Sequence, residues 1–262
     1  MQHFVIGDIH GCGEEFGWLL GAIDRILEPE ATHLVLLGDH LAKGPRPDLV
    51  IRKIIDRRHL GGRVTLLCGN HELRFLEAIG RLGTGIAHPK LPRSDRETIE
   101  LLEKKQLLEL AVELMEEAAR TIQYTMVSAC GLWTVVHGGI DPDEGLDGTS
   151  DHDKIHMKTR RGEPNWWDRY DGSDGLIICG HKPLPEPVLR RDCRDRPTAI
   201  NLDTGCIYGG HLTAYHVEGD RLLQVRSLQP IDRERIEFAV SPTVAPSEAP
   251  AAWDARGRTY AS

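Results

Sequence analysis

Residues 3–11 read His-Phe-Val-Ile-Gly-Asp-Ile-His-Gly and decide the fold of this chain of 262 residues. The apolar run at 3–6 ends at a glycine, which is typical of a buried strand. Two side chains that can bind a metal, Asp8 and His10, follow directly after it. In open α/β sheets, ligands lie beyond the carboxyl ends of the strands. The stretch therefore predicts a first strand that carries part of a functional site at its end.

The elements that follow this strand alternate between helix and strand. Apolar residues at helical spacing predict the helices, short apolar runs predict the strands, and Pro29 ends the first helix. The predicted ranges are a helix at 14–27, a strand at 34–37, a helix at 48–57, a strand at 64–67 and a helix at 71–79. A β-α-β-α-β order predicts a mostly parallel sheet covered by helices.

The second half of the chain has a different texture. A Gly- and Pro-rich loop at 80–93 precedes a helical insertion at 95–119 with one apolar stripe. Short β-prone runs then predict a second sheet that faces the first, with strands at 121–127, 132–136, 176–179, 198–202, 212–216 and 221–226. We expect one domain over residues 1–238, whose helical insertion spans about 81–120, and a mobile tail rich in Ala, Pro and Ser at 239–262.

Composition limits the possible partners and the compartment. The formal net charge of −8, from 32 basic and 40 acidic residues, lacks the basic footprint of a DNA-binding protein. The sequence has no signal peptide and no apolar run near the roughly 18 residues that a membrane helix needs. The six cysteines contain no CxxC pair, which favours free thiols. We therefore expect a cytoplasmic protein without a membrane or DNA partner, and its oligomeric state stays open.

Five predicted strand ends share one feature, a glycine beside side chains that can bind a metal. They are Gly7-Asp8-Ile9-His10, Gly38-Asp39, Gly69-Asn70-His71-Glu72, His137-Gly138-Gly139 and Gly180-His181. Each of these alone is common in proteins that bind no metal, since Gly-Asp is an ordinary turn and a single His is often a core residue. The five together, each at a strand end, favour a shared site.

The residue types fit a pair of divalent metal ions. Asp8 and Asp39 offer carboxylates, Asn70 offers an amide oxygen, and the histidines offer imidazoles. A nitrogen and oxygen donor set without thiolates suits Mn²⁺ first, with Fe, Zn²⁺ or Co²⁺ as alternatives. Two ions about 3.5–4 Å apart can clamp the attacking and leaving oxygens of a phosphoryl transfer. The glycines let the backbone turn sharply and approach the ions.

In order and context these motifs resemble those of the calcineurin-like metallophosphoesterase superfamily. Within it, the chain is similar to the branch of the phosphoprotein phosphatases and symmetrical diadenosine tetraphosphate hydrolases. The motifs span residues 7–181, and the stretch 201–213 resembles the C-terminal region of the latter enzymes, so that the resemblance covers about residues 3–226. It implies an α/β/β/α sandwich, with two mixed sheets flanked by helices and a dinuclear metal centre between them.

The resemblance also implies a role for each matching residue. Asp8 and His10 would bind the first metal, and Asp39 would bridge both ions. Asn70, His137 and His181 would complete the second site. His71 would protonate the leaving oxygen as general acid, and the nucleophile would be a hydroxide that bridges the two ions.

The second motif departs from the family pattern. Where Asp-Arg-Gly is usual, this chain has Ala42-Lys43-Gly44. The missing Asp supports the catalytic histidine in protein phosphatases, and Ala is more similar to the dinucleoside polyphosphate hydrolases. Lys43 keeps the positive charge but loses the bidentate fork of arginine. Lys43 is one phosphate-binding candidate, and Arg160 or Arg161 is the other, although a solvated surface arginine is an equal reading for either.

These features predict an enzyme that hydrolyses a phosphoester or phosphoanhydride. The preferred substrate is a dinucleoside polyphosphate such as diadenosine tetraphosphate. The alternatives are a protein (Ser, Thr or Tyr) or small-molecule phosphomonoester, and polyphosphate. A phosphate-binding module without turnover is a further alternative, but it would not need the general acid His71. The segment 80–120 could be a lid over the site or an inert helical hairpin.

Overall fold

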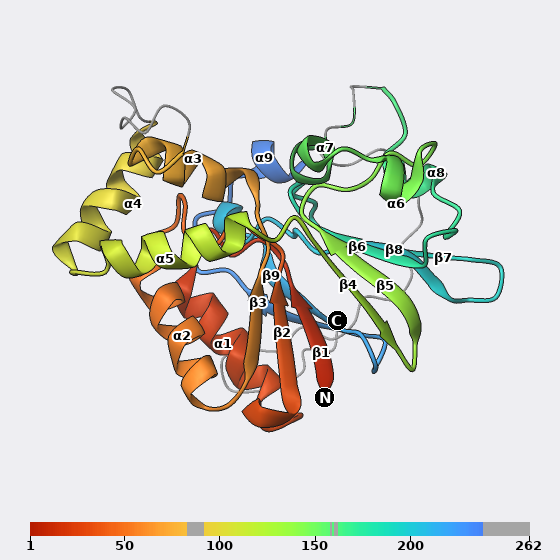
Figure 1. Cartoon of the computed structure of the whole chain (residues 1–262), viewed down its shortest axis with the longest axis horizontal. Coiled ribbons are helices and arrows are strands. Elements are labelled where there is room, and N and C mark those ends of the chain that lie inside the picture. The colour runs from red at the N-terminus through yellow and green to blue at the C-terminus, as the bar shows by residue number, and fades with distance from the viewer. Residues whose placement is uncertain (83–91, 158, 160–161, 238–262) are drawn as a thin grey trace.

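The computed structural model describes residues 1–82, 92–157, 159 and 162–237. Two five-stranded sheets pack face to face, and helices cover their outer faces (Figure 1). The first sheet has the order β10-β9-β1-β2-β3 and the second the order β4-β5-β6-β8-β7. The strands are β1 Gln2–Ile6, β2 Thr32–Leu36, β3 Arg63–Leu66, β4 Gln123–Ser128, β5 Gly131–Val136, β6 Leu176–Cys179, β7 Val188–Arg191, β8 Pro197–Asn201, β9 His211–His216 and β10 Arg221–Arg226. The predicted α/β/β/α sandwich of two mixed sheets is confirmed.

The first strand shows why its sequence is apolar throughout. Phe4 and Ile6 of β1 pack against the helices, whereas Val5 points toward the second sheet, and all three are fully buried. A strand buried on both faces reads as a continuous apolar run rather than an alternating one. β1, β2 and β3 run parallel, as do β5, β6 and β8. Their carboxyl ends therefore carry loops that can meet at one edge of the sandwich.

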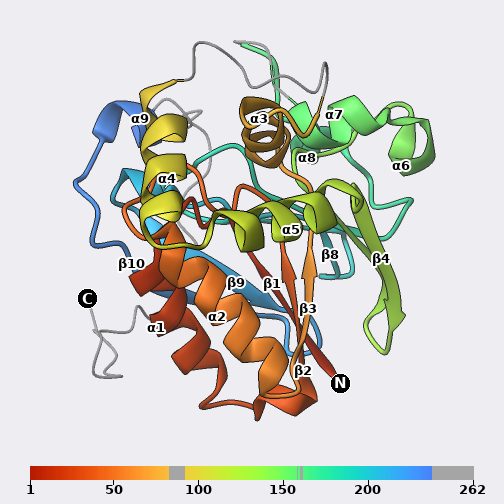
Figure 2. The same ribbon diagram turned by 60° about the vertical axis from the view of Figure 1, so that its left-hand side comes forward.

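Helices cover the outer face of each sheet. Figure 2 shows α1 and α2 across the outer face of the first sheet. The bounds are α1 Gly13–Ile23, α2 Pro47–His59, α3 Asn70–Ala78, α4 Arg93–Lys104, α5 Leu108–Ala119, α6 Gly145–Gly148, α7 Asp151–His156, α8 Trp166–Arg169 and α9 Arg233–Glu237, with 3₁₀ turns at Pro29–Ala31 (η1) and Cys206–Tyr208 (η2). Within the described residues, no helix has the length and apolarity that crossing a membrane would require.

Several details differ from the expectations. The last two strands, β9 and β10, belong to the first sheet, because β9 pairs antiparallel with β1. The local sequence predicts these two strands, but it does not indicate which strands they pair with. β7 was not expected, since its half-buried Val-Leu-Arg-Arg is a charged edge strand. The first helix ends at Ile23 rather than residue 27, and the insertion contains two helices, α4 and α5, separated by a turn in which Gln106 has φ 57°. The expected tail at 239–262 lies outside the described residues.

Candidate metal centre

The predicted site residues come from five loops that each follow a parallel strand. The loops after β1, β2 and β3 belong to the first sheet, and those after β5 and β6 belong to the second. In this order they carry Asp8 and His10, Asp39, Asn70 with His71, His137 and His181. Except for Asn70 and His181, which are partly exposed, these side chains are buried. The structure therefore brings together residues from both sheets at a shared edge.

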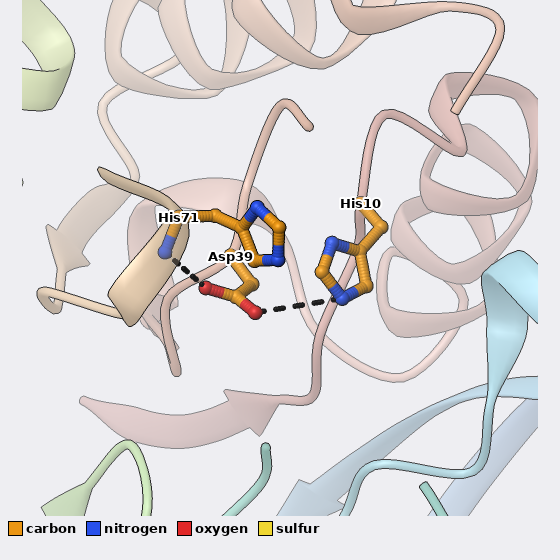
Figure 3. Close-up of side chains that lie close together, drawn as sticks. All are labelled: His10, Asp39 and His71. Carbon is orange, nitrogen blue, oxygen red and sulfur yellow. Dashed lines mark hydrogen bonds and ion pairs between the residues drawn. The ribbon is translucent and has the colours of Figure 1, made fainter. Parts of the chain in front are cut away.

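Asp39 lies between two groups of nitrogen ligands. Its Oδ2 is 3.5 Å from Nε2 of His10, and its Oδ1 is 3.6 Å from Nε2 of His137. The backbone N–H of His71 donates to Oδ1 at 3.0 Å. Figure 3 shows His10 and His71 on either side of this carboxylate. Asp39 thus belongs to two sets of side chains close enough to hold an ion, one with His10 and His71 and one with His137 and His181.

The second group is completed by an amide and another imidazole. Nε2 of His137 lies 3.4 Å from Oδ1 of Asn70 and 3.2 Å from Nδ1 of His181. Nδ1 of His137 is 3.0 Å from the carbonyl oxygen of Leu37, to which it can donate. A hydrogen bond from one ring nitrogen fixes the tautomer that leaves the other nitrogen free to bind a metal. His137 is therefore oriented to use Nε2.

Asp8 is held by a close approach of the backbone. The N–H of His181 lies 3.2 Å from each of its carboxylate oxygens. A Cβ atom at Gly180 would stand 2.1 Å from Oδ1 of Asp8, and one at Gly69 would stand 2.4 Å from Oδ1 of Asp39. Any side chain at these two positions would displace the carboxylates. Glycine is thus required for contact with the site rather than for the turn alone.

The buried carboxylates of the site give it the electrostatic character of a cation-binding site. Burial raises the pKa of Asp8 well above its usual value, and Asp203 and Asp39 raise it further. Burial also acts to raise the pKa of Asp39, but His137, His10 and neighbouring cations lower it below its ordinary range. Burial raises the pKa of Asp203 to about 7. Carboxylates that are buried near one another are stabilised as anions by a divalent cation, so the donor set fits two such ions.

The backbone around the site is strained. Seven non-glycine residues of the described chain have a positive φ, and four of them lie here: His10 at 47°, Asp39 at 51°, Lys43 at 74° and His181 at 67°. Side chains with a Cβ rarely adopt this conformation, and such strain gathers at functional sites. The surrounding structure therefore holds these four residues against a local cost.

Glu72 is a supporting residue to which the sequence pattern gave no role. Its Oε2 accepts hydrogen bonds from the backbone N–H groups of Asp39 at 2.7 Å and Gly69 at 2.8 Å. Its Oε1 accepts from the N–H of His40 at 2.8 Å. Burial, with Asp39 nearby, raises the pKa of Glu72 to about 7. The signal was present in the sequence, since Glu72 stands three residues after Gly69, the position from which a glutamate at the start of a helix can accept from the N-cap N–H.

The phosphate-binding candidates have different outcomes. Nζ of Lys43 lies 3.3 Å from Nε2 of His10 and 3.4 Å from the hydroxyl of Tyr208. Lys43 is therefore at the site, beside a tyrosine that the sequence reading did not single out. Arg160 and Arg161 lie outside the described residues.

Known proteins resemble this chain over most of its length. The symmetrical bis(5'-nucleosyl)-tetraphosphatase of Erwinia tasmaniensis is 35% identical, covering 90% of this chain and 99% of that protein. The asymmetrical bis(5'-nucleosyl)-tetraphosphatase PrpE of Bacillus subtilis is 27% identical, covering 90% of this chain and 98% of that protein.

Solved structures share the fold. A crystal structure provisionally assigned as a diadenosine tetraphosphatase superposes with a TM-score of 0.59 at 22% identity, covering 86% of this chain and 93% of that one. A metallophosphoesterase from Sphaerobacter thermophilus gives a TM-score of 0.51 at 19% identity, covering 87% and 88%. The family model of the calcineurin-like phosphoesterases matches residues 1–215. With the dinuclear donor set described above, this match shows that the chain belongs to the calcineurin-like phosphoesterase family and is a metal-dependent phosphoester hydrolase.

Proposed function

We propose that this protein hydrolyses a dinucleoside polyphosphate such as diadenosine tetraphosphate at a centre of two divalent ions. The observation that carries the proposal is the Asp39 carboxylate shared between two groups of donors. The substrate is supported by relatives named as bis(5'-nucleosyl)-tetraphosphatases, of both the symmetrical and the asymmetrical type. The six cysteines, all within the described residues, are unpaired, which supports a cytoplasmic location.

Each side chain of the centre has a proposed role. Asp8 and His10 would hold the first ion, Asp39 would lie between the two, and the second would be held by Asn70, His137 and His181. Nitrogen and oxygen donors suit Mn²⁺ first and then Fe, Zn²⁺ or Co²⁺. When bound, the ions supply a nucleophile at neutral pH and neutralise the charge of the reacting phosphate.

His71 is the proposed general acid. Its ring lies beside that of His10, with centroids 5.1 Å apart, and its Nδ1 is buried. Nε2 is therefore the nitrogen available to the open side of the site. A proton from Nε2 would go to the oxygen of the leaving group as its bond to phosphorus breaks.

Two positively charged side chains near Tyr208, those of Lys43 and Arg235, support a substrate with several phosphates. Lys43 Nζ lies beside the hydroxyl of Tyr208, and the guanidinium of Arg235 in α9 lies 5.8 Å from the same ring. The positive charge of Lys43 also acts on the buried carboxylates of Asp8, Asp39 and Asp203. Figure 1 draws α9 at the same end of the sandwich as α3. Cations at this end of the sandwich suit phosphates beyond the reacting one. They would equally suit inorganic polyphosphate, which is our second candidate.

A substrate panel tests the proposal. The Mn²⁺-loaded protein would be given diadenosine tetraphosphate, polyphosphate, phosphopeptides and p-nitrophenyl phosphate, and compared by kcat/KM. We expect the highest value for diadenosine tetraphosphate. A higher kcat/KM for a phosphopeptide would contradict the proposed substrate. If no substrate were hydrolysed with Mn²⁺, Co²⁺, Ni²⁺ or Zn²⁺, only the non-catalytic phosphate-binding alternative would remain.

His71→Asn tests the role of the general acid. We expect kcat to fall about 10²- to 10⁴-fold, because proton transfer to the leaving group contributes that much. Metal content, measured by mass spectrometry of the purified protein, should be unchanged. Because His71 lies within ligand distance of His10 and Asp39, loss of one ion in this variant would make His71 a ligand instead.

Arg235→Gln tests whether Arg235 contacts a phosphate beyond the reacting one. We expect KM for diadenosine tetraphosphate to rise about three- to tenfold, since an exposed charged contact contributes on the order of 1 kcal/mol. The KM for p-nitrophenyl phosphate, which has one phosphate, should stay the same. Arg52→Gln, an exposed arginine on α2, is the matched control. Equal effects on both substrates would argue against a polyphosphate subsite.

A further inference from the structure

One ring nitrogen of His71 has no partner. Nδ1 of this histidine is buried and makes no hydrogen bond within the described residues. A buried donor left unsatisfied is costly, and an imidazole that transfers protons through one nitrogen needs the other held in a fixed tautomer. The inference that follows rests on the proposed function, in which His71 is the general acid and its Nδ1 needs a hydrogen-bonding partner.

A small cavity lies directly beside this histidine. Its volume is about 10 Å³, and it is lined by the polar side chains of His71, Glu72, Asp95 and Thr98 together with Ala42 and other apolar side chains. This is about the smallest space that accommodates one water molecule. The four polar side chains of the lining are the candidates for the two or more hydrogen-bonding partners that an ordered water needs.

Asp95 brings a carboxylate to this cavity from the helical insertion. It lies in the first turn of α4 and is only 5% exposed. Its Oδ2 accepts a hydrogen bond from Nη2 of Arg74 at 2.5 Å. Its Oδ1 has only a long contact, 3.4 Å, from the hydroxyl of Ser94. One oxygen of a buried carboxylate therefore has capacity to accept a further hydrogen bond.

We propose that Asp95 is the positioning residue of His71 and acts on Nδ1 through one water in this cavity. The water would accept the hydrogen of Nδ1 and donate to Asp95, so that Nε2 stays directed at the leaving group. The carboxylate comes from α4, which gives the helical insertion a part in the chemistry. Ala42, which lines the same cavity, has no polar side-chain atom to serve this purpose.

A purely structural reading of Asp95 must be distinguished from this one. The ion pair with Arg74 ties α4 to α3, and its loss alone could loosen the insertion. Arg74→Gln breaks the same ion pair but keeps the Asp95 carboxylate. Ala42→Asp adds a carboxylate to the cavity from another direction. These two changes show whether Asp95 matters because it anchors α4 or because it positions His71.

The experiment compares Asp95→Asn with Arg74→Gln in the metal-loaded protein. For Asp95→Asn we expect kcat on phenyl phosphate to fall about ten- to a hundredfold with KM within twofold, as for other partners of catalytic groups. The loss should be smaller on p-nitrophenyl phosphate, whose leaving group needs less protonation. Arg74→Gln should keep kcat within threefold. Ala42→Asp in the Asp95→Asn background should recover a large part of kcat.

A double-mutant comparison and a spectroscopic reading complete the test. Adding Asp95→Asn to His71→Asn should cause no further loss, because both act on one step. Imidazole nitrogen NMR of the metal-free protein should show the Nδ1–H tautomer of His71, and Asp95→Asn should shift that signal. Equal losses in Arg74→Gln and Asp95→Asn, or no rescue by Ala42→Asp, would overturn the positioning role while His71 remained the acid. Full activity of His71→Asn would overturn both.

Discussion

At the scale of single residues, the site depends on conformations that its own side chains disfavour. His10, Asp39 and His181 hold positive φ angles that cost on the order of 1 kcal/mol or more each. Some contacts that maintain them lie within the donor set, such as those from the N–H of His181 to Asp8, and others come from outside it. Glu72 binds the loops of Asp39 and Gly69 together with three backbone hydrogen bonds. A buried acceptor of this kind maintains the position of Asp39 between its two groups of nitrogen donors.

Replacement of Glu72 tests this role. Glu72→Gln keeps the shape but places an amide N–H₂ against a backbone donor, which leaves at least one N–H unsatisfied. We expect metal affinity to fall about 10- to 100-fold, as for other groups that orient metal ligands. The midpoint of thermal unfolding should fall as well. Glu77→Gln, an exposed glutamate of the same helix, should change neither. Metal titration of both variants decides, and unchanged affinity in Glu72→Gln would contradict the role.

At the scale of elements, β2 carries function at one end and a titratable cluster at the other. Its carboxyl end leads to Asp39, whereas His33 near its start lies 2.9 Å from the hydroxyl of Thr65 on β3. The hydroxyl of Tyr124 on β4 lies 3.4 Å from the other ring nitrogen. Burial, followed by His3 and Arg63, lowers the pKa of His33 to about 4. His33 is therefore neutral in the folded protein near pH 6.

This cluster predicts a pH dependence of stability. In the unfolded chain, His33 takes up a proton below its ordinary pKa of about 6.5, whereas the folded protein takes it up only near pH 4. The contribution of neutral His33 to the free energy of unfolding is thus fully present above pH 6.5 and decreases as the pH falls toward 4. His33→Gln should flatten the slope of unfolding free energy against pH in this window. His152→Gln, whose side chain is 76% exposed, should leave the slope unchanged. An equal slope for wild type and His33→Gln would disprove the assignment.

At the scale of the whole molecule, the candidate metal centre requires both sheets. The first supplies Asp39 and the second His137 and His181, so their relative position sets the distances between donors. A shared core fixes that position. Val35 of the first sheet and Ile178 and Trp133 of the second are among its fully buried members. We therefore expect the two sheets to unfold together.

Ile178→Ala tests this coupling. Removing a fully buried isoleucine from the core between the sheets should lower the free energy of unfolding by about 2–5 kcal/mol. Denaturation should remain a single transition when followed by both tryptophan fluorescence and circular dichroism. Val127→Ala, at a position 74% exposed, should cost less than about 0.5 kcal/mol. Two separate transitions would show that the sheets are independent.

The fold class and the clustering of the candidate donors could be predicted because both follow from local properties of the chain. Apolar runs ending at glycine mark the strands, and each ligand stands within a few residues of such an end. Packing could not be predicted in the same way. The assignment of β9 to the first sheet, the turn between α4 and α5 and the edge strand β7 depend on partners distant in sequence.

By itself, the sequence determined that side chains able to bind a metal follow five strand ends, because strand and turn propensities act over a few residues. Only the tertiary structure decided what surrounds them. Glu72 becomes a support because two loops fold onto it, and Tyr208 contacts both Lys43 and Arg235 because the end of the chain returns to the site. Asp95 lines a cavity with His71 because α4 folds back so that Asp95 pairs with Arg74 of α3. Such contacts join residues that no local pattern links, so they arise only when the whole chain is packed.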